Sequence, residues 1–167
     1  MIFVTADHHF GHKNIIKYCD RPFRDIGKMN KAFIRKWNYT VGTDDTVYYL
    51  GDFALTPVWY AQNIMDKLNG YKILIRGNHD GSVTRMKRIG FHEVYNEPYL
   101  FDKNKCIFFS HNPIANSFNV NVGVDVWDYA PVELNKALSL VPDYIWRRHR
   151  VVLCGHVHNN WVTRFLK

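Results

Sequence analysis

Short runs of apolar residues recur along the chain and give its clearest structural signal. Each run is four to seven residues long and is bounded by polar or turn-forming residues, a pattern typical of β-strands. The segment 100–109 is polar at 102–105, which predicts a hairpin that turns there. The six predicted strands lie at 2–5, 46–50, 72–75, 105–109, 120–126 and 151–154.

Helical periodicity separates several of these strands. Apolar residues recur three and four positions apart at Met29, Phe33 and Trp37, which predicts an amphipathic helix. Thr56 is expected to cap a second helix, because Pro57 suits a first helical position. The predicted helices lie at 12–19, 28–39, 57–68, 82–89 and 131–140.

The alternation of strands and helices predicts an α/β fold in which much of the sheet is buried on both faces. The chain shows no linker, internal repeat or low-complexity stretch. Residues 1–167 are therefore expected to form one domain, a length that suits a single core.

The net charge and the composition narrow the class of partner and the cellular location that we expect. The net charge is +7 and the isoelectric point is near 9.3, which favours anionic partners such as phosphates, nucleotides or nucleic acid. No apolar run approaches the ~20 residues of a membrane span, and no secretory leader is evident, so we expect a cytoplasmic protein without a membrane partner. Cys106 and Cys154 lie in apolar runs and are expected to be buried free thiols, and Cys19 has no CxxC partner.

Polar residues that bind metals follow five of the predicted strands. The letters are "ADHH" after 2–5, "GDFA" after 46–50, "RGNHD" after 72–75, "SHNP" after 105–109 and "CGHVH" at 154–158, where the run 151–154 ends. In open α/β sheets, ligands bind beyond the carboxyl ends of the strands. The five strand ends are therefore expected to converge on one site.

The side chains at these ends are carboxylates, amides and imidazoles, without thiolates. Such a set suits manganese, iron, zinc, cobalt or nickel. Asp7 and His9 are two residues apart, as are His156 and His158. In extended backbone, residues i and i+2 share a face, so each pair could reach one ion. Glycines at positions 51, 77 and 155 permit the backbone to approach closely.

These motifs, in this order, resemble those of the calcineurin-like metallophosphoesterase family. The family pattern is DxH, GD, GNH(D/E), a later H and GHxH, and the resemblance covers essentially the whole chain. It implies a mixed-sheet fold, a layered α/β sandwich. The matching segments are Asp7-x-His9, Gly51-Asp52, Gly77-Asn78-His79-Asp80, His111 and Gly155-His156-x-His158.

The resemblance also implies a centre of two divalent transition-metal ions, with manganese expected first and iron, zinc, nickel or cobalt as alternatives. Asp52 would bridge the ions, and a bridging hydroxide would attack phosphorus. His79 would donate a proton to the leaving oxygen or stabilise charge on the phosphoryl group. The ligands implied for one ion are Asp7, His9 and His158, and those for the other are Asn78, His111 and His156.

Several of these residues have a plainer interpretation. The ligand set as a whole could be polar caps at strand ends, although five ordered motifs argue against it. Alternation points His8 away from Asp7 and His9, so a packing or surface role is expected for it. His12 either contacts a substrate phosphate or caps the helix that follows. Asp80 either orients a neighbour or caps the helix beginning at Ser82, and the cap is favoured.

The basic residues fall into two groups according to their position in the sequence. Lys13, Lys17, Arg21 and Arg24 follow the first metal loop, and Arg85, Lys87 and Arg88 follow "GNHD", so these are placed to meet substrate. The candidate substrate-binding residues are His12, Lys13 and Arg85. The basic cluster at 147–150 precedes the last strand and is expected at the opposite end of the sheet, as solvated surface. Phe10, Phe23 and Trp59 could stack on substrate, but a core role is favoured.

Two features depart from the family pattern. In the protein Ser/Thr phosphatase branch the second motif reads GDxxDRG, whereas Leu55 stands at the place of its second Asp here, which argues against a protein phosphatase. The segment 119–132 resembles a strand that small members place after GHxH. Either the strand order differs here or the closing strands come from elsewhere in the chain.

The expected function is metal-dependent hydrolysis of phosphate esters, foremost diesters of nucleotide or nucleic-acid type. A phosphomonoesterase acting on nucleotides or nucleic-acid 3′ ends is the alternative within the same enzyme class. A catalytically silent metal-bound scaffold and a basic nucleic-acid-binding module are alternatives of other classes. His79 argues against the scaffold, which has no use for a proton donor.

Overall fold

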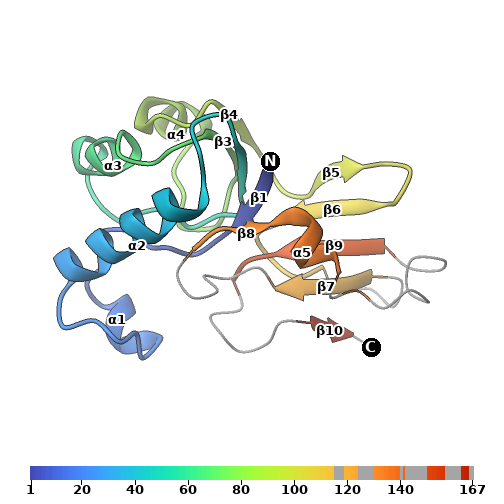
Figure 1. Cartoon of the computed structure of the whole chain (residues 1–167), viewed down its shortest axis with the longest axis horizontal. Coiled ribbons are helices and arrows are strands. Elements are labelled where there is room, and N and C mark those ends of the chain that lie inside the picture. Colours follow the sequence, from blue (N-terminus) through green and yellow to red (C-terminus); the bar gives the residue numbers. More distant parts are fainter. Residues whose placement is uncertain (115–118, 124–129, 140, 142–149, 157–162, 166–167) are drawn as a thin grey trace.

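Two five-stranded sheets pack face to face, and helices cover the outer face of the first sheet (Figure 1). The computed structural model describes residues 1–114, 119–123, 130–139, 141, 150–156 and 163–165. This mixed α/β arrangement confirms the layered sandwich that the sequence predicts.

The first sheet has the order β4-β3-β2-β1-β8. Strands β1 to β4 are parallel, and β8 pairs antiparallel with β1. The predicted strands at 2–5, 46–50 and 72–75 are confirmed within a residue, whereas β4 and β8 are additions. Their bounds are Ile2–Thr5 for β1, Thr46–Tyr49 for β2, Tyr71–Ile75 for β3, Glu93–Tyr95 for β4 and Val132–Glu133 for β8.

The second sheet has the order β10-β7-β9-β6-β5. Strands β6, β9 and β7 are parallel, and the edge strands β5 and β10 are antiparallel to their neighbours. The predicted hairpin is confirmed as β5 and β6. Although β7 precedes β9 in the chain, it lies beyond β9 in the sheet, between β9 and the edge strand β10, so one of the two strands beyond β9 does come from an earlier segment. The bounds are Tyr99–Asp102 for β5, Ile107–Ser110 for β6, Asn119–Gly123 for β7, Arg150–Cys154 for β9 and Thr163–Phe165 for β10.

Five helices lie in the described part of the chain, at or near the predicted positions. Helix α2 is capped by the Asp25 carboxylate, which accepts from the Lys28 amide at 2.8 Å, and α4 is capped by the Ser82 hydroxyl. The expected cap at Thr56 is wrong: α3 begins after Pro57 without a side-chain cap. Helix α5 is shorter than predicted because Val132–Glu133 pairs with β1. The bounds are Ile15–Tyr18 for α1, Ile26–Thr40 for α2, Val58–Met65 for α3, Val83–Ile89 for α4 and Leu134–Leu138 for α5.

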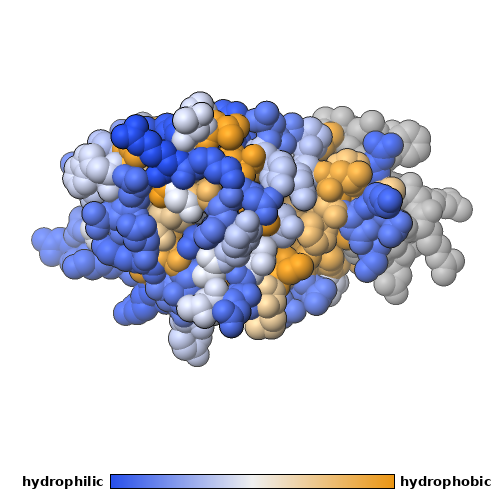
Figure 2. All heavy atoms as spheres, turned by 90° about the horizontal axis from the view of Figure 1, so that it is seen from above, coloured by the Kyte–Doolittle hydropathy of each residue, from blue (hydrophilic) through white to orange (hydrophobic). Residues whose placement is uncertain are grey.

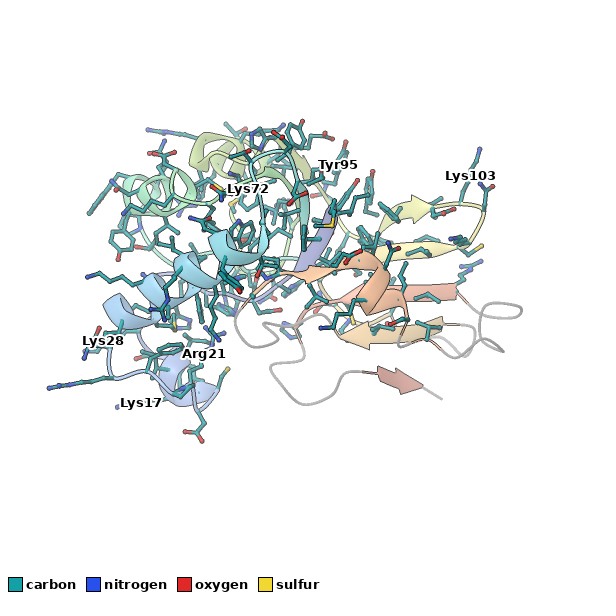
Figure 3. The ribbon with its side chains drawn as sticks, viewed as in Figure 1. Lys17, Arg21, Lys28, Lys72, Tyr95 and Lys103 are labelled. Atoms are coloured by element: carbon teal, nitrogen blue, oxygen red, sulfur yellow. The ribbon has the colours of Figure 1, made fainter. Side chains whose placement is uncertain are left out.

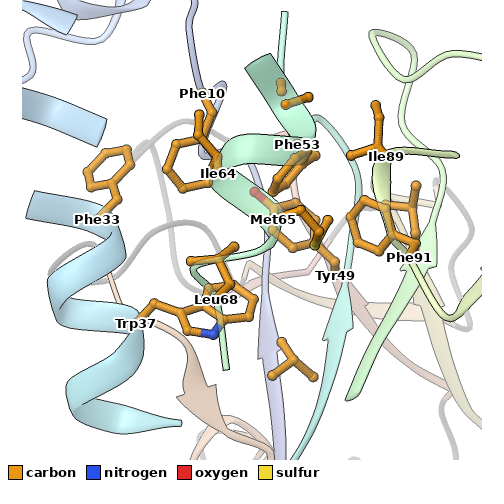
Figure 4. Packing of buried hydrophobic residues seen from close by; sticks show 14 of the residues in the cluster. Phe10, Phe33, Trp37, Tyr49, Phe53, Ile64, Met65, Leu68, Ile89 and Phe91 are labelled. Atoms are coloured by element: carbon orange, nitrogen blue, oxygen red, sulfur yellow. The ribbon is translucent and has the colours of Figure 1, made fainter. Parts of the chain in front are cut away.

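Two cores explain why the strands read as unbroken apolar runs. An aromatic-rich core fills the space between the first sheet and helices α2, α3 and α4, and Trp37 of α2 and Tyr49 of β2 both belong to it (Figure 4). An aliphatic core joins the two sheets. Successive residues of β1 supply both, since Phe3 packs into the first core and Val4 into the second.

The surface corrects two expectations about single residues. Cys106 is exposed, not buried, because it lies in the turn between β5 and β6, whereas Cys154 is buried, and neither cysteine forms a disulfide. Trp59 is exposed, while Phe10 belongs to the core.

On the face shown in Figure 2, hydrophilic side chains dominate the left-hand end, and hydrophobic ones gather towards the middle. Across the described residues, no helix is long and apolar enough to cross a membrane.

Candidate metal centre

The loops that follow five strands meet at one place between the two sheets. One atom from each of Asp7, Asp52, His111 and His156 lies within 4.8 Å of the others. These residues follow β1 and β2 of the first sheet and β6 and β9 of the second. Asn78, after β3, joins them through its Oδ1, which lies 2.9 Å from His111 Nε2. The predicted convergence of the strand ends is therefore confirmed.

The Asp52 carboxylate lies at the middle of this cluster. Its Oδ1 accepts the His79 amide at 2.9 Å. Its Oδ2 is buried and accepts no hydrogen bond from the residues that the structure describes. Instead, the Nε2 atoms of three histidines surround Oδ2, His111 at 3.5 Å, His9 at 3.6 Å and His79 at 4.0 Å.

These separations test whether the residues fit a cation. Nitrogen and oxygen ligands at about 2.0–2.2 Å from a transition metal lie roughly 3–3.5 Å from one another. The distances from Asp52 Oδ2 to His9 and His111 are too long for hydrogen bonds and close to that range. An anionic oxygen buried among imidazoles in this way fits a site that holds positive charge.

The ring of His111 gives a second, independent fit. Its Nδ1 lies 2.9 Å from the Leu50 carbonyl oxygen and donates its proton there, which leaves a lone pair on Nε2. That lone pair faces Asn78 Oδ1 at 2.9 Å and His156 Nδ1 at 3.1 Å. An amide oxygen directed at that lone pair is stabilised by a cation between the two atoms. The residues present therefore fit a metal ion.

Asp7 and His9 reach the cluster through an unexpected backbone conformation. Their φ angles are +55° and +52°, in the left-handed region, and Asp52 and His156 are left-handed as well. The expectation that extended backbone aligns Asp7 with His9 is therefore wrong, although both side chains do reach the site, with His9 Nε2 3.6 Å from Asp7 Oδ1. Left-handed residues other than glycine cost of order 1–3 kcal/mol each and gather at functional sites.

The buried side chain of Arg21 stabilises the strained loop that contains Asp7 and His9. Its guanidinium donates to the carbonyl oxygens of Asp7 and His8, both at 2.7 Å, and the residue is buried. The expectation that Arg21 meets substrate is wrong, because its donors are turned inward to the loop. Lys13, Lys17 and Arg24 are exposed.

Three glycines make room for the ligand atoms. A Cβ on Gly51 would lie 2.4 Å from His111 Nδ1, and one on Gly77 would lie 2.4 Å from Asp52 Oδ1. A Cβ on Gly155 would lie 2.5 Å from Asp7 Oδ2. Only Gly51 also needs a positive φ, at +85°. At the other two positions glycine is required for space.

His8 has the packing role that the sequence predicts. It is fully buried, its Nδ1 lies 2.6 Å from the Tyr49 hydroxyl, and its ring stacks on Phe10. Burial, with help from the nearby Arg21, holds the pKa of His8 well below its usual value, so the ring stays neutral. His8 therefore fixes the loop to the aromatic core and does not face the candidate metal centre.

Asp80 corrects another expectation. It does not cap α4, because its carboxylate accepts from the amides of Asp52 at 2.9 Å, Phe53 at 3.1 Å and Gly77 at 2.8 Å. Burial raises the pKa of Asp80, although the backbone amides oppose the rise. Asp80 thus ties the loop after β2 to the loop after β3.

Glu97 is a residue that sequence reasoning missed. Its carboxylate accepts the amides of His111 and Asn112, the Ser110 hydroxyl and the Asn112 side-chain amide, at 2.6 to 2.9 Å. Burial alone would raise the pKa of Glu97, but these hydrogen bonds outweigh it and hold the pKa below its usual value. No motif marks Glu97, and only the pairing of β5 with β6 brings it there.

Two further histidines, His12 and His79, lie beside the ring of His9. Burial is the largest of the influences that lower the pKa of His9 to about 3, so its ring is neutral and available to a cation at pH 7. The ring centroids of His79 and His12 each lie 5.7 Å from that of His9. The side chain of His79 is 46% exposed, so it can meet a substrate from solvent.

The remaining predicted residues are Arg85, the basic cluster at 147–150 and His158. The guanidinium of Arg85 donates to the Thr56 carbonyl at 2.8 Å. Arg150 begins β9 and is exposed, at the end of that strand opposite His156, as expected for the basic cluster. His158 and residues 147–149 lie outside the described residues. The structure therefore brings together six of the seven expected ligands and places His79 beside them.

Comparisons with known proteins agree with this geometry. The family model described as calcineurin-like phosphoesterase matches residues 1–160. An uncharacterized protein of Methanocaldococcus jannaschii is 34% identical over 159 residues, covering 84% of this chain and 90% of that protein. The Gene 66 protein of Mycobacterium phage L5 is 34% identical over 80 residues, covering 46% of this chain and 38% of that protein.

A solved structure shares the fold. The crystal structure of a protein of unknown function from Aquifex aeolicus matches with a TM-score of 0.67 and 24% identity, covering 84% of this chain and 99% of that one.

Proposed function

Since the chain belongs to the calcineurin-like phosphoesterase family, we propose that it hydrolyses phosphodiesters of nucleotide or nucleic-acid type with two divalent metal ions. One observation carries the proposal, the buried Asp52 Oδ2 with three imidazole nitrogens 3.5 to 4.0 Å away. A carboxylate so placed can serve two cations at once and offset their repulsion.

Asp7 and His9 would hold one ion with His158, and Asn78, His111 and His156 would hold the other. Bound there, the two ions would supply Lewis acidity and a water deprotonated near neutral pH, as two-metal sites do. Manganese is the first candidate, because oxygen and imidazole ligands without sulfur suit it.

The residues of the chain supply orientation and proton transfer. Leu50 fixes the ring of His111 through its carbonyl, and Asp52 fixes the loop of His79 by accepting the His79 amide. The exposed His79 ring can donate a proton to the leaving oxygen of a bound ester. The neutral His and Asn ligands leave the occupied centre net positive, which suits an anionic substrate.

The substrate class is tested by comparing a diester with a monoester. Purified protein with Mn²⁺ is expected to hydrolyse bis(p-nitrophenyl) phosphate faster than p-nitrophenyl phosphate, and EDTA should stop both reactions. A monoester rate above the diester rate would favour the phosphomonoesterase instead. Failure to cleave either ester with metal bound would overturn the proposal.

The role of His79 is tested by His79→Ala. We expect the turnover of bis(p-nitrophenyl) phosphate to fall by about 10²–10⁴-fold, the usual contribution of a general acid, while the metal content measured by elemental analysis is unchanged. His92→Ala is the control, because His92 precedes β4 and its ring contacts Lys72, at the end of β3 opposite Asn78. Unchanged turnover in His79→Ala would remove His79 from the mechanism.

A further inference from the structure

Most of the net positive charge of the chain lies in one segment, which follows the first loop of the proposed metal centre in the sequence. Residues 13–36 contain eight Lys or Arg and two Asp, a formal charge of +6 out of the +7 of the whole chain. This segment begins one residue after His12 and comprises α1, the link to α2 and most of α2. Figure 3 shows Lys17 and Lys28 projecting from this end of the molecule.

Most of these cationic side chains are exposed and are not used in salt bridges within the described fold. Lys13, Lys17, Arg24 and Lys28 are exposed, and none forms a salt bridge with another described residue. Only Arg21 is buried among them, where it donates to the first metal loop. Of the two acids, Asp25 caps α2. The exposed cations are therefore available to an external anion.

Aromatic rings connect the metal centre with this surface. His79 and His12 flank the ring of His9, each with centroids 5.7 Å apart from it. Tyr18 then meets His12 edge to face at 6.1 Å, and Tyr18 is 73% exposed. A ring that exposed buries little in the core, but it offers a stacking platform next to Lys17.

We propose that the exposed side chains of Lys13, Lys17, Tyr18, Arg24 and Lys28, called here the basic surface, bind single-stranded nucleic acid and deliver its backbone to the metal centre. The lysines and Arg24 contact successive phosphates, and Tyr18 stacks on an unpaired base. This inference rests on the proposed function, since it names the substrate class of the same site.

The arrangement favours this ligand over other anions. A mononucleotide needs one or two cations, whereas the basic surface extends from α1 to the first turn of α2. Paired bases are stacked inside a duplex and cannot stack on Tyr18, so a single strand uses the platform fully. An anionic membrane offers charge but no phosphodiester that the centre could hydrolyse.

Binding is measured without cleavage by keeping EDTA in the buffer. A fluorescein-labelled oligothymidylate of about 20 nucleotides is titrated with the full chain, and anisotropy is followed at several salt concentrations. Lys17→Gln/Lys28→Gln should weaken binding about tenfold or more at low salt. It should also reduce the slope of log K against log salt by about 1.4, the contribution of two phosphate contacts on a single strand.

Matched variants distinguish an effect of the basic surface on binding from an effect of net charge alone. Lys103→Gln/Lys105→Gln removes the same charge from the turn between β5 and β6, at the opposite end of the molecule (Figure 3), and should leave the slope unchanged. Tyr18→Ala should weaken binding about 5- to 100-fold, as expected for one stacked base. Tyr39→Ala removes a tyrosine that is 94% exposed at the other end of α2 and should have no effect.

Three outcomes overturn the inference. The first is an equal loss of affinity in the two lysine pairs, and the second is preference for a duplex of the same length. The third is tighter binding to vesicles of phosphatidylserine than to the oligonucleotide. Hydrolysis of bis(p-nitrophenyl) phosphate by the wild type is scored separately, so a failed basic surface and a failed metallophosphoesterase are told apart.

Discussion

Residues that are neighbours in the sequence have different roles in this protein. In "ADHHFGH", Asp7 and His9 face the metal centre, His8 faces Tyr49 in the core, and His12 stands between the centre and Tyr18. His8 faces the opposite side from Asp7 and His9, as alternation predicts, but the backbone at Asp7 and His9 is left-handed and not extended. Arg21 holds that conformation through two carbonyl oxygens.

Asp80→Asn tests how strongly one carboxylate organises the centre. An amide cannot accept on both of its terminal atoms, so at least one of the three buried backbone amides loses its acceptor. We expect the free energy of unfolding in urea to fall by about 1–3 kcal/mol, the cost of an unsatisfied buried donor. Calorimetry should also show weaker Mn²⁺ binding, because Asp52 is held by this contact.

Asp44→Asn is the control for this change, because Asp44 is exposed. If Asp80→Asn unfolds like the wild type, the carboxylate does not hold the two loops.

The residues of the centre could be read from the sequence because they are chemically distinctive and follow strands. Their backbone conformation could not, because the left-handed φ angles arise from contacts made across the fold. Asp80 illustrates the limit. Its position before Ser82 suggests a helix cap, and only the spatial approach of the β2 loop makes it an anchor instead.

Among the elements, the ends of β2, β3 and β6 matter most for the site. Each is followed by a short loop that a single acidic side chain fixes, Asp80 for the first two and Glu97 for the third. Strand positions were predictable from unbroken apolar runs. The short edge strands β4 and β10 and the two-residue β8 were not, because so few residues carry no measurable periodicity.

Glu97→Gln tests the anchor of the β6 loop. The pKa of Glu97 is held below 4.5, so its charge stabilises the fold above that pH, and the contribution is lost as pH falls through the lower folded-state pKa. We expect the variant to unfold about 1–2 kcal/mol more easily at pH 7, from the loss of charge-assisted hydrogen bonds. In EDTA, the difference from the wild type should shrink towards zero as the pH falls below 4.5.

Urea titrations of both proteins from pH 7 down to the acid limit measure this difference. A difference that stays constant with pH would show that the charge of Glu97 is not its source.

At the scale of the whole molecule, the residues of the candidate metal centre come from both sheets. Asp7, Asp52 and Asn78 follow strands of the first sheet, and His111 and His156 follow strands of the second. A cation bound by both sets therefore connects both layers of the sandwich. The layered fold was predictable from alternating elements, but the partition of the strands into two sheets depends on pairings that the sequence pattern does not encode.

Metal binding should accordingly stabilise the entire fold. At a free Mn²⁺ concentration 100 times the dissociation constant, linkage gives about 2.7 kcal/mol. For a chain of this length, that corresponds to a rise of about 5–10 °C in the melting temperature. Asp52→Asn should lose most of this rise, whereas Asp44→Asn should keep it. Equal shifts in the two variants would place the ions elsewhere.

The decisive measurement titrates metal-free protein with Mn²⁺ while bound metal and hydrolysis of bis(p-nitrophenyl) phosphate are followed together. Turnover is expected to rise with occupancy and to level off at two ions per chain. Full occupancy without hydrolysis, or hydrolysis that persists in EDTA, would contradict a two-metal phosphoesterase centred on Asp52.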